Sequence, residues 1–304
     1  MRHRSRIASR RPPRRIGYAA ALACVLTLVG AGCGSSEDAL QQPTPSAVTS
    51  STASSSTEPS PTASSSTSSP TDSDGRVGSD MLFNGADHWG GDVDVSCPAG
   101  KDVRIIVVRG TLENVGDGSL GELARMIDDR LGGRAAIDDL DYPASWEAGS
   151  EARGVNMLVK TLNAQAQACP DVKTVLLGYS QGAMVVGDAL SAPDVRFNKD
   201  DGQRVSARAL ANIAAVELFG DPRFDGSADY GTGDYDRSVD GILGARGGDD
   251  LRALSGRIIS YCNADDFACQ LGGHGDAHGL YRSNGSFDDA AQYAVTRIHT
   301  ALGE

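Results

Sequence analysis

Ser180 is the residue whose surroundings point most directly to chemistry. It stands in Gly178-Tyr179-Ser180-Gln181-Gly182, where an apolar run typical of a strand passes into a helix-forming run. A sharp turn between a strand and a helix crowds the backbone, which favours glycine two positions on either side of the serine. The turn also lifts the hydroxyl above the sheet at a helix N-terminus, where backbone N–H groups can bind an oxyanion. The pattern predicts a nucleophilic serine.

A nucleophilic serine needs a base, and four histidines follow the leader segment. His88 precedes the first predicted strand and His299 lies near the end of the closing helix, where surface or packing roles are usual. His274 and His278 lie together in a glycine-rich loop after the last predicted strand, so the base is sought there. Spacing alone leaves both of them open.

The base needs an orienting carboxylate, and the chain offers more than one. Asp265 and Asp266 follow the last predicted strand, and Asp221 follows an earlier one in Gly-Asp-Pro, where it is also a good turn former. A metal site at His274 and His278 is not expected, because the glycines between and after them disfavour a helix and no third ligand is evident.

Strands and helices alternate along the chain after about residue 81. Strands are predicted at 103–108, 135–140, up to Tyr179, at 213–219 and at 257–261, and helices at 120–131, 150–168, after Ser180 and at 288–302. This alternation predicts an α/β fold with a mostly parallel sheet covered on both faces. Ligands bind such sheets beyond the carboxyl ends of the strands. The residues at those ends are Thr111, Ser180, Asp221 and Asp266.

The first part of the chain is expected to be an address and a tether. Residues 1–33 combine an arginine-rich start with a short apolar run that ends at Cys33 after small residues, as in a signal peptide whose cysteine receives a lipid. Residues 34–80 are rich in Ser, Thr and Pro and are expected to form a disordered linker. The folded domain is then 81–304, and we expect a secreted or surface protein that the lipid on Cys33 anchors to the bacterial membrane.

The charge of the chain limits its partners. The formal net charge is −12, and the basic leader makes the remainder more acidic still. No basic patch is visible, which argues against nucleic acid or an anionic membrane surface as a partner.

Four cysteines remain after the leader, and an exported domain is expected to oxidise them to two disulfides. Cys262 and Cys269 are close in sequence and are expected to pair, which leaves Cys97 to pair with Cys169. The shorter bridge would rigidify the segment that carries Asp265 and Asp266. A zinc site is not expected, because the chain has no Cys-x-x-Cys pair.

Taken together, these motifs resemble the cutinase family of serine esterases, especially its actinobacterial members. Cys169 stands eleven residues before Ser180, as in cutinases, and Tyr142-Pro143-Ala144 is similar to the family's Tyr-Pro-Ala. The segment from Cys262 to Cys269 is similar to the family's disulfide-closed Cys-x-x-x-Asp-x-x-Cys loop. The remaining matches are His278 with Tyr281, which resemble a His-x-x-Tyr motif, and Arg109-Gly110-Thr111, which stands where the family has an Arg-Gly-Ser or Arg-Gly-Thr.

The resemblance implies roles for individual residues. Ser180 would be the nucleophile, His278 the base and Asp266 the acid, while Asp265 would be a bystander. The backbone N–H groups of Thr111 and Gln181 would form the oxyanion hole. The role of segment 224–251, which is rich in Gly and Asp, stays open.

The resemblance also implies a fold and an activity. The fold would be a three-layer α/β-hydrolase sandwich, and the protein a monomeric ester hydrolase without metal or other cofactor. Its substrates would be polyesters, lipids or acyl esters. Two alternatives are a catalytically silent surface lipoprotein and an acyltransferase that uses the same triad.

Overall fold

The computed structural model describes residues 95–304, which all lie in one compact unit, Pro70–Glu304. The predicted signal peptide (1–33) with Cys33, the predicted linker (34–80) and His88 lie outside the described residues. Within residues 95–304, no helix has the length and apolar character needed to cross a bilayer.

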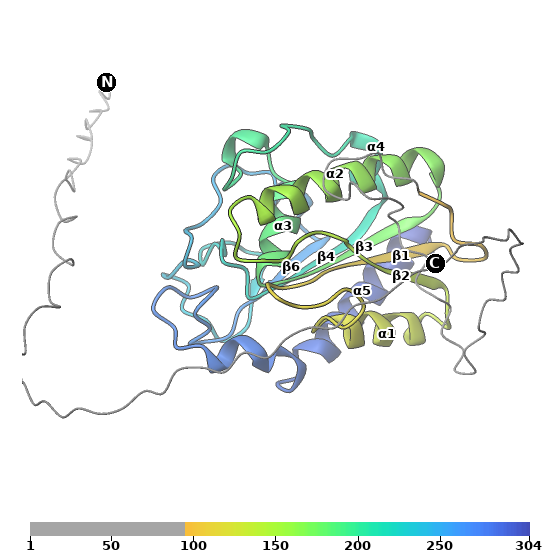
Figure 1. Cartoon of the computed structure of the whole chain (residues 1–304). Coiled ribbons are helices and arrows are strands. Elements are labelled where there is room, and N and C mark those ends of the chain that lie inside the picture. The colour runs from red at the N-terminus through yellow and green to blue at the C-terminus, as the bar shows by residue number, and fades with distance from the viewer. Residues whose placement is uncertain (1–94) are drawn as a thin grey trace, which may run out of the picture. The chain divides into compact units, whose positions relative to one another are not determined.

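A parallel sheet of six strands forms the middle of the fold (Figure 1). All of its pairs are parallel and its strand order is β2-β1-β3-β4-β6-β5. The strands are β1 (Val103–Val108), β2 (Ala135–Asp139), β3 (Lys173–Tyr179), β4 (Ile213–Phe219), β5 (Gly231–Thr232) and β6 (Ile258–Tyr261). Every residue of β1 and β4 is buried, as expected for strands covered on both faces.

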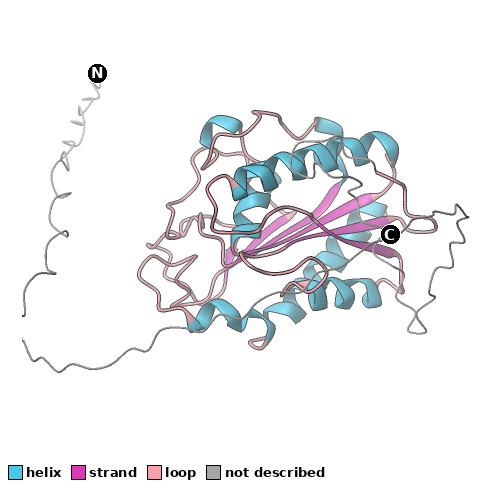
Figure 2. Cartoon of the chain, viewed as in Figure 1, coloured by secondary structure: helices cyan, strands magenta, loops and turns pink. Residues whose placement is uncertain are grey.

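Helices cover both faces of the sheet, so the fold has the three layers expected from the sequence (Figure 2). One face carries α2 (Ser150–Ala168), α3 (Gln181–Ala189) and α4 (Ala207–Asn212). The other face carries α1 (Gly121–Arg130) and α5 (Ser286–Leu302). Short 3₁₀ helices η1 (Pro193–Val195), η2 (Arg252–Leu254) and η3 (Asp276–Arg282) lie in the connections.

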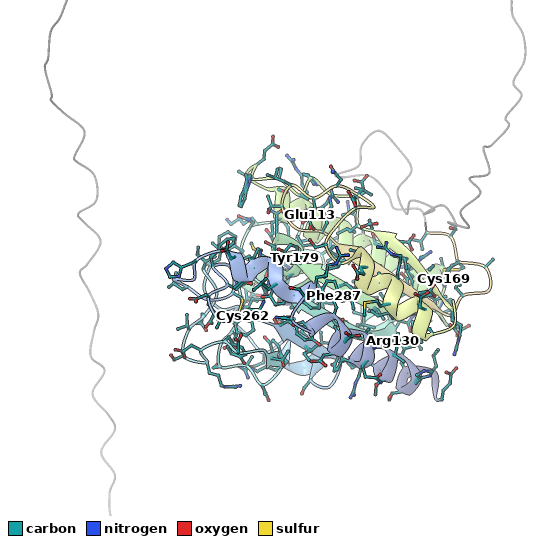
Figure 3. The ribbon with its side chains drawn as sticks, turned by 90° about the horizontal axis from the view of Figure 1, so that it is seen from below. Glu113, Arg130, Cys169, Tyr179, Cys262 and Phe287 are labelled. Atoms are coloured by element: carbon teal, nitrogen blue, oxygen red, sulfur yellow. A yellow bond between two sulfur atoms is a disulfide. The ribbon has the colours of Figure 1, made fainter. Side chains whose placement is uncertain are left out.

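Two apolar clusters hold the layers together, one on each face of the sheet. Leu158 and Val185 belong to the cluster under α2 and α3. On the other face Phe287, labelled in Figure 3, projects from α5, and its ring meets the ring of Phe219 edge to face at 5.8 Å. Burial of these side chains drives the stacking of helices on the sheet.

Besides the three 3₁₀ helices, the structure contains a helix and a strand that the sequence pattern did not predict, α4 and β5. Helix α4 has only six residues, and its one local signal is Ser206, whose hydroxyl accepts a hydrogen bond from the N–H of Ala209 at 3.2 Å. Strand β5 has two residues and is held by its pairing with β6. Both are too short to produce a periodic pattern.

The two predicted disulfides are confirmed. Cys97 pairs with Cys169, which lies 72 residues away at the end of α2, and Cys262 pairs with Cys269 after β6. The second bridge closes a loop that we call the β6 loop, residues 262–269. Because the bridge joins residues only seven apart, it restrains this loop locally.

Glu217 is a carboxyl group enclosed within the fold. It lies on β4, is fully buried, and no side chain among residues 95–304 hydrogen-bonds to it. Burial raises the pKa of Glu217 well above its ordinary value, and the backbone of Ala294 on α5 opposes only part of that shift. The folded protein therefore favours the protonated form.

We expect Glu217→Gln to stabilise the protein increasingly as the pH rises. The unfolded chain ionises Glu217 near its ordinary pKa, whereas the folded state keeps it protonated, so the wild type loses stability as the pH rises above that value. Each unit of pKa difference corresponds to roughly 1.4 kcal/mol. Melting temperatures at about pH 4, 6 and 8 check this, with a gap of several degrees expected at the highest pH. A gap that is the same at every pH would contradict a protonated Glu217.

Candidate active site

The turn between β3 and α3 holds Ser180 in an unusual backbone conformation. Ser180 follows the last residue of the strand, precedes the first residue of the helix, and has φ 53° and ψ −119°. Residues other than glycine rarely adopt a positive φ, and those that do cluster at functional sites. Gly178 permits the tight turn, because a Cβ there would lie 2.8 Å from the Gly182 carbonyl oxygen, and Gly182 lets α3 begin against β1, because a Cβ there would lie 1.9 Å from the carbonyl oxygen of Val108. The predicted sharp turn is therefore present.

Asp266 lies in the β6 loop and its side chain is fully buried. Its Oδ1 accepts hydrogen bonds from the N–H of Ala268 and from Nδ1 of His278, both at 2.8 Å, and its Oδ2 accepts one from the hydroxyl of Tyr281. Burial alone would raise the pKa of Asp266, but the hydrogen bond and charge of His278, together with the other two donors, hold it below its ordinary value. Asp266 is therefore ionised at neutral pH.

His278 is enclosed by two segments, β3 and the β6 loop, whose side chains hold its ring in place. The ring stacks on Tyr179 at 4.9 Å between centroids and contacts the Phe267 ring at 4.8 Å, which leaves 12% of the side chain exposed. The Tyr179 hydroxyl donates a hydrogen bond to the His278 carbonyl at 3.0 Å. Because Nδ1 donates to Asp266, the second ring nitrogen, Nε2, is left free to accept a proton.

Two contacts bring the turn at Ser180 beside this imidazole. Tyr179, which stacks on His278, is the residue before Ser180. In addition, the N–H of Ser180 donates to the carbonyl of Phe219 at 2.8 Å, and the next residue, Gly220, lies against the ring of His278. A Cβ on Gly220 would lie 2.7 Å from His278 Cε1. The serine turn thus lies next to the His278–Asp266 pair.

The loop after β1 lies beside the start of α3 and carries Thr111. A Cβ on Gly182 would touch the carbonyl oxygen of Arg109 at 2.6 Å, so the two segments are in contact. The Arg109 guanidinium donates to the carbonyl of Leu140 at 2.7 Å, and the carboxylate of Glu113 accepts from the N–H of Gly110 at 2.7 Å. These bonds shape the loop, and they bring Thr111 to the same end of the sheet as Gln181.

The two other candidates from this part of the chain, His274 and Asp265, lie away from Asp266 and His278. The His274 side chain is 87% exposed, and its nearest carboxylate is that of Asp265, with Nδ1 3.6 Å from Oδ1. The Asp265 side chain is exposed as well. The structure therefore places His278 and Asp266 together and leaves His274 and Asp265 at the surface.

Asp221, the third candidate acid, lies in a buried ion cluster with Asp188, Arg223 and Arg246. Arg246 forms ion pairs with Asp221 and with Asp188, the latter at 2.7 Å, and Arg223 lies 2.9 Å from Asp188. The Arg246 guanidinium fits against α3 only because residue 187 is glycine, since a Cβ there would lie 2.4 Å from its central carbon. Asp221 also accepts the N–H of Arg223 at 2.9 Å, so its turn-forming role is present too.

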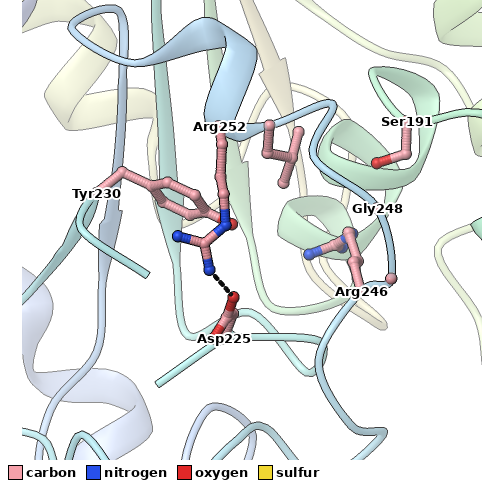
Figure 4. A pocket seen from close by; sticks show the side chains of 8 residues that line it. Ser191, Asp225, Tyr230, Arg246, Gly248 and Arg252 are labelled. Atoms are coloured by element: carbon pink, nitrogen blue, oxygen red, sulfur yellow. Dashed lines mark hydrogen bonds and ion pairs between the residues drawn. The ribbon is translucent and has the colours of Figure 1, made fainter. Parts of the chain in front are cut away.

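A small hollow lies beside this cluster and is lined by segment 224–251 and its neighbours (Figure 4). Its Arg252 pairs with Asp225 at 2.8 Å, and its Arg246 is held by the ion cluster, so both guanidinium groups already have carboxylate partners. None of Ser180, Asp266 and His278 lines this hollow. Across residues 95–304, no three His, Cys, Asp or Glu side chains are grouped so that they could hold a metal ion.

Sequence reasoning missed three aromatic contacts of the site, those of Tyr179, Phe267 and Tyr281. Tyr179, labelled in Figure 3, lies within the serine pentapeptide, but nothing in that pattern indicates that its ring would stack on a histidine far along the chain. Tyr281 had a signal, because it stands three residues after His278. In a 3₁₀ helix such residues lie on the same side.

Comparisons with known proteins place the chain in one family. The profile of the family named Cutinase matches residues 98–298. A cutinase of Kineococcus radiotolerans is 30% identical over 207 residues, which cover 66% of this chain and 63% of that protein. The carboxylesterase Culp1 of Mycobacterium tuberculosis is 29% identical over 219 residues, which cover 68% of this chain and 90% of that protein.

Solved structures share the fold. The catalytic core domain of an acetyl xylan esterase from Trichoderma reesei superposes with a TM-score of 0.54 at 24% identity, and the match covers 67% of this chain and all of that domain. A cutinase-like protein from Cryptococcus sp. gives a TM-score of 0.51 at 20% identity, covering 68% of this chain and 98% of that one.

We expect Gly220→Ala to separate the imidazole of His278 from Asp266. The added Cβ would lie 2.7 Å from His278 Cε1 and 2.9 Å from Asp266 Oδ2, and Gly220 has φ 58°, where side chains other than hydrogen are strained. The measurement is the proton resonance of His278 Nδ1–H, which should shift or vanish. Gly279→Ala is the control, because its Cβ meets nothing within 4 Å. An unchanged resonance in Gly220→Ala would contradict this packing.

Proposed function

This chain belongs to the cutinase family of carboxylic ester hydrolases, and from that premise we propose that Ser180, His278 and Asp266 form its catalytic triad. The observation that carries the proposal is the 2.8 Å hydrogen bond between His278 Nδ1 and the buried carboxylate of Asp266, beside the positive-φ turn at Ser180. A base oriented by a carboxylate next to a serine at a helix start is the arrangement that activates a hydroxyl.

The acylation step follows from the roles of the three side chains. His278 Nε2 takes the proton of Ser180 as Oγ attacks the ester carbonyl carbon, and the carbonyl electrons move to its oxygen. Asp266 keeps the imidazole in the tautomer with the proton on Nδ1 and stabilises the imidazolium. When the intermediate collapses, His278 gives the proton to the leaving alcohol, and the acyl group stays on Ser180.

Water completes the cycle by the reverse sequence. His278 takes a proton from the water that attacks the acyl-enzyme, and returns it to Ser180 as the acid leaves. In both steps the oxyanion is bound by the backbone N–H groups of Gln181 and Thr111. Support comes from the position of Gln181 as the first residue of α3 and from the contact between α3 and the loop of Thr111. One such donor contributes roughly 3–4 kcal/mol to the transition state.

We propose uncharged esters with an apolar acyl chain as substrates, such as lipids or polyesters. Large apolar side chains stand exposed on the loops that surround the site, with Leu112 69% and Trp146 77% exposed. The N–H of Leu112 donates to the carbonyl of Ala144 at 2.6 Å, so these two loops are joined. Phe267 and Leu280 are also exposed, on the His278 side. Apolar surface around a cleft favours apolar ligands, and the acidic chain disfavours anionic ones.

We also propose that the protein is exported and that a lipid on Cys33 attaches it to the membrane. The leader sequence motivates this, and the two disulfides fit an oxidising compartment. The folded domain would then act on esters outside the cytoplasm.

We expect Ser180→Ala and His278→Ala each to lower the hydrolysis of a chromogenic butyrate ester by at least about a thousandfold. The melting temperature of Ser180→Ala should stay close to that of the wild type, because Ser180 is only half-buried and the change removes a single oxygen. His274→Ala is the matched control and should keep full activity, since this side chain is exposed. Turnover retained by Ser180→Ala would remove the proposed nucleophile.

The exposed apolar rim predicts a dependence on acyl chain length. We expect the double substitution Leu112→Ser and Leu280→Ser to lower kcat/KM for an octanoate ester about tenfold relative to an acetate ester, because each apolar methylene contacted contributes roughly 0.8 kcal/mol. The acetate ester is the internal control for folding and chemistry. An equal loss on both esters would show that the rim does not bind the acyl chain.

A further inference from the structure

The carboxylate of Asp266 receives two side-chain donors from one short helix. His278 and Tyr281 stand three residues apart on η3, and a 3₁₀ helix has about three residues per turn, so both side chains lie on the side that faces the β6 loop. His278 Nδ1 binds Oδ1, and the Tyr281 hydroxyl binds Oδ2. One turn of helix therefore supplies a donor to each oxygen of the carboxylate.

The contacts around Tyr281 fix the position and direction of its hydroxyl group. The side chain is buried and its ring meets Phe219 edge to face at 5.5 Å. The hydroxyl oxygen accepts the N–H of Asn263 at 3.3 Å and lies 3.6 Å from the sulfur of Cys269. With its acceptor site occupied by Asn263, its one proton points to Asp266. The same loop thus orients the hydroxyl and carries the carboxylate.

We propose that Tyr281 is a positioning residue that acts through Asp266 to set the basicity of His278. A hydrogen bond to Oδ2 draws negative charge away from the oxygen that faces the imidazole, so the carboxylate stabilises the imidazolium less than a bare carboxylate would. The base then stays unprotonated, and active, to lower pH. This inference rests on the proposed triad.

The tyrosine can serve as a donor over the whole working range of the site. Burial raises the pKa of Tyr281 well above its ordinary value, and the charge of Asp266 raises it further. The titratable groups that face it are Asp266, whose hydrogen bond it makes, His278 beside it on η3, and Tyr179 from β3. The pKa of Tyr179 is raised by burial as well, so neither phenol ionises at neutral pH.

The test is Tyr281→Phe, which keeps the ring against Phe219 and removes only the hydroxyl. We expect kcat/KM for the butyrate ester to fall about tenfold with little change in KM, because one buried hydrogen bond to a charge is lost. The acid limb of the pH profile should move to higher pH, since the unshielded carboxylate holds the imidazolium more strongly. A loss equal at every pH, with the limb unmoved, would overturn the proposal and leave Tyr281 a packing residue.

Tyr293→Phe on α5 is the matched control. It removes a buried hydroxyl that has no hydrogen-bond partner among residues 95–304, and it should change neither the rate nor the pH profile. A shift of the acid limb in this variant equal to that of Tyr281→Phe would also overturn the proposal, because the effect would not depend on Asp266.

A second measurement separates this proposal from the triad itself. In the Ser180→Ala background, the imidazole of His278 is titrated by NMR in three proteins: with Tyr281 intact, with Tyr281→Phe, and with 3-fluorotyrosine in place of Tyr281. The pKa of His278 should rise with Tyr281→Phe and fall with the more acidic fluorinated phenol. These shifts would stand even if Ser180→Ala retained turnover, whereas a titration that is the same in all three proteins would refute the coupling. The fluorinated protein keeps this test available should Tyr281→Phe fail to fold.

Discussion

A carboxylate keeps its charge in a protein interior only where donors surround it, and the site of this protein depends on that condition at Asp266. The donors come from two places, the backbone of the β6 loop and one turn of η3. The disulfide holds the first, and the contacts of His278 with Tyr179, on which it stacks, and with Phe267 hold the second. Asp266 therefore stays charged only while the β6 loop, η3 and the turn at Ser180 are held together.

The parallel sheet brings these distant segments together at the carboxyl ends of its strands. Strands β1, β3, β4 and β6 are neighbours or nearly so in the sheet and all run the same way, so the loops that follow them meet at their carboxyl ends. Contacts without room for a side chain then set the distances, at Gly182 against Val108 and at Gly220 against His278. The site is therefore built mainly from backbone packing, and side chains such as Arg109 brace the loops.

Much of this architecture could be predicted from the sequence, because long apolar runs and paired cysteines carry local signals. Ser180 stood out through its flanking glycines, and the predicted strands placed Thr111, Asp221 and Asp266 at carboxyl ends of the sheet with it, although Asp221 belongs to the buried ion cluster. The choice of His278 over His274 needed a family resemblance, since nothing in their spacing shows that one ring is enclosed and the other exposed. The partner of Asp221 could not be foreseen either, because Arg246 is 25 residues away and a long-range ion pair leaves no periodic pattern.

The position of Arg246 constrains what segment 224–251 can do. Its guanidinium lies against α3 and pairs with two buried carboxylates, Asp188, which Arg223 also pairs, and Asp221. A movement of the segment that withdrew this cation would leave the buried Asp221 without its ion-pair partner, at a cost of about 3–5 kcal/mol. The ion pairs therefore anchor the part of the segment that carries Arg246 to α3 and to the end of β4. A deletion that included Arg246 would leave Asp221 buried without this cation, so it would call for a neutral residue at position 221 as well.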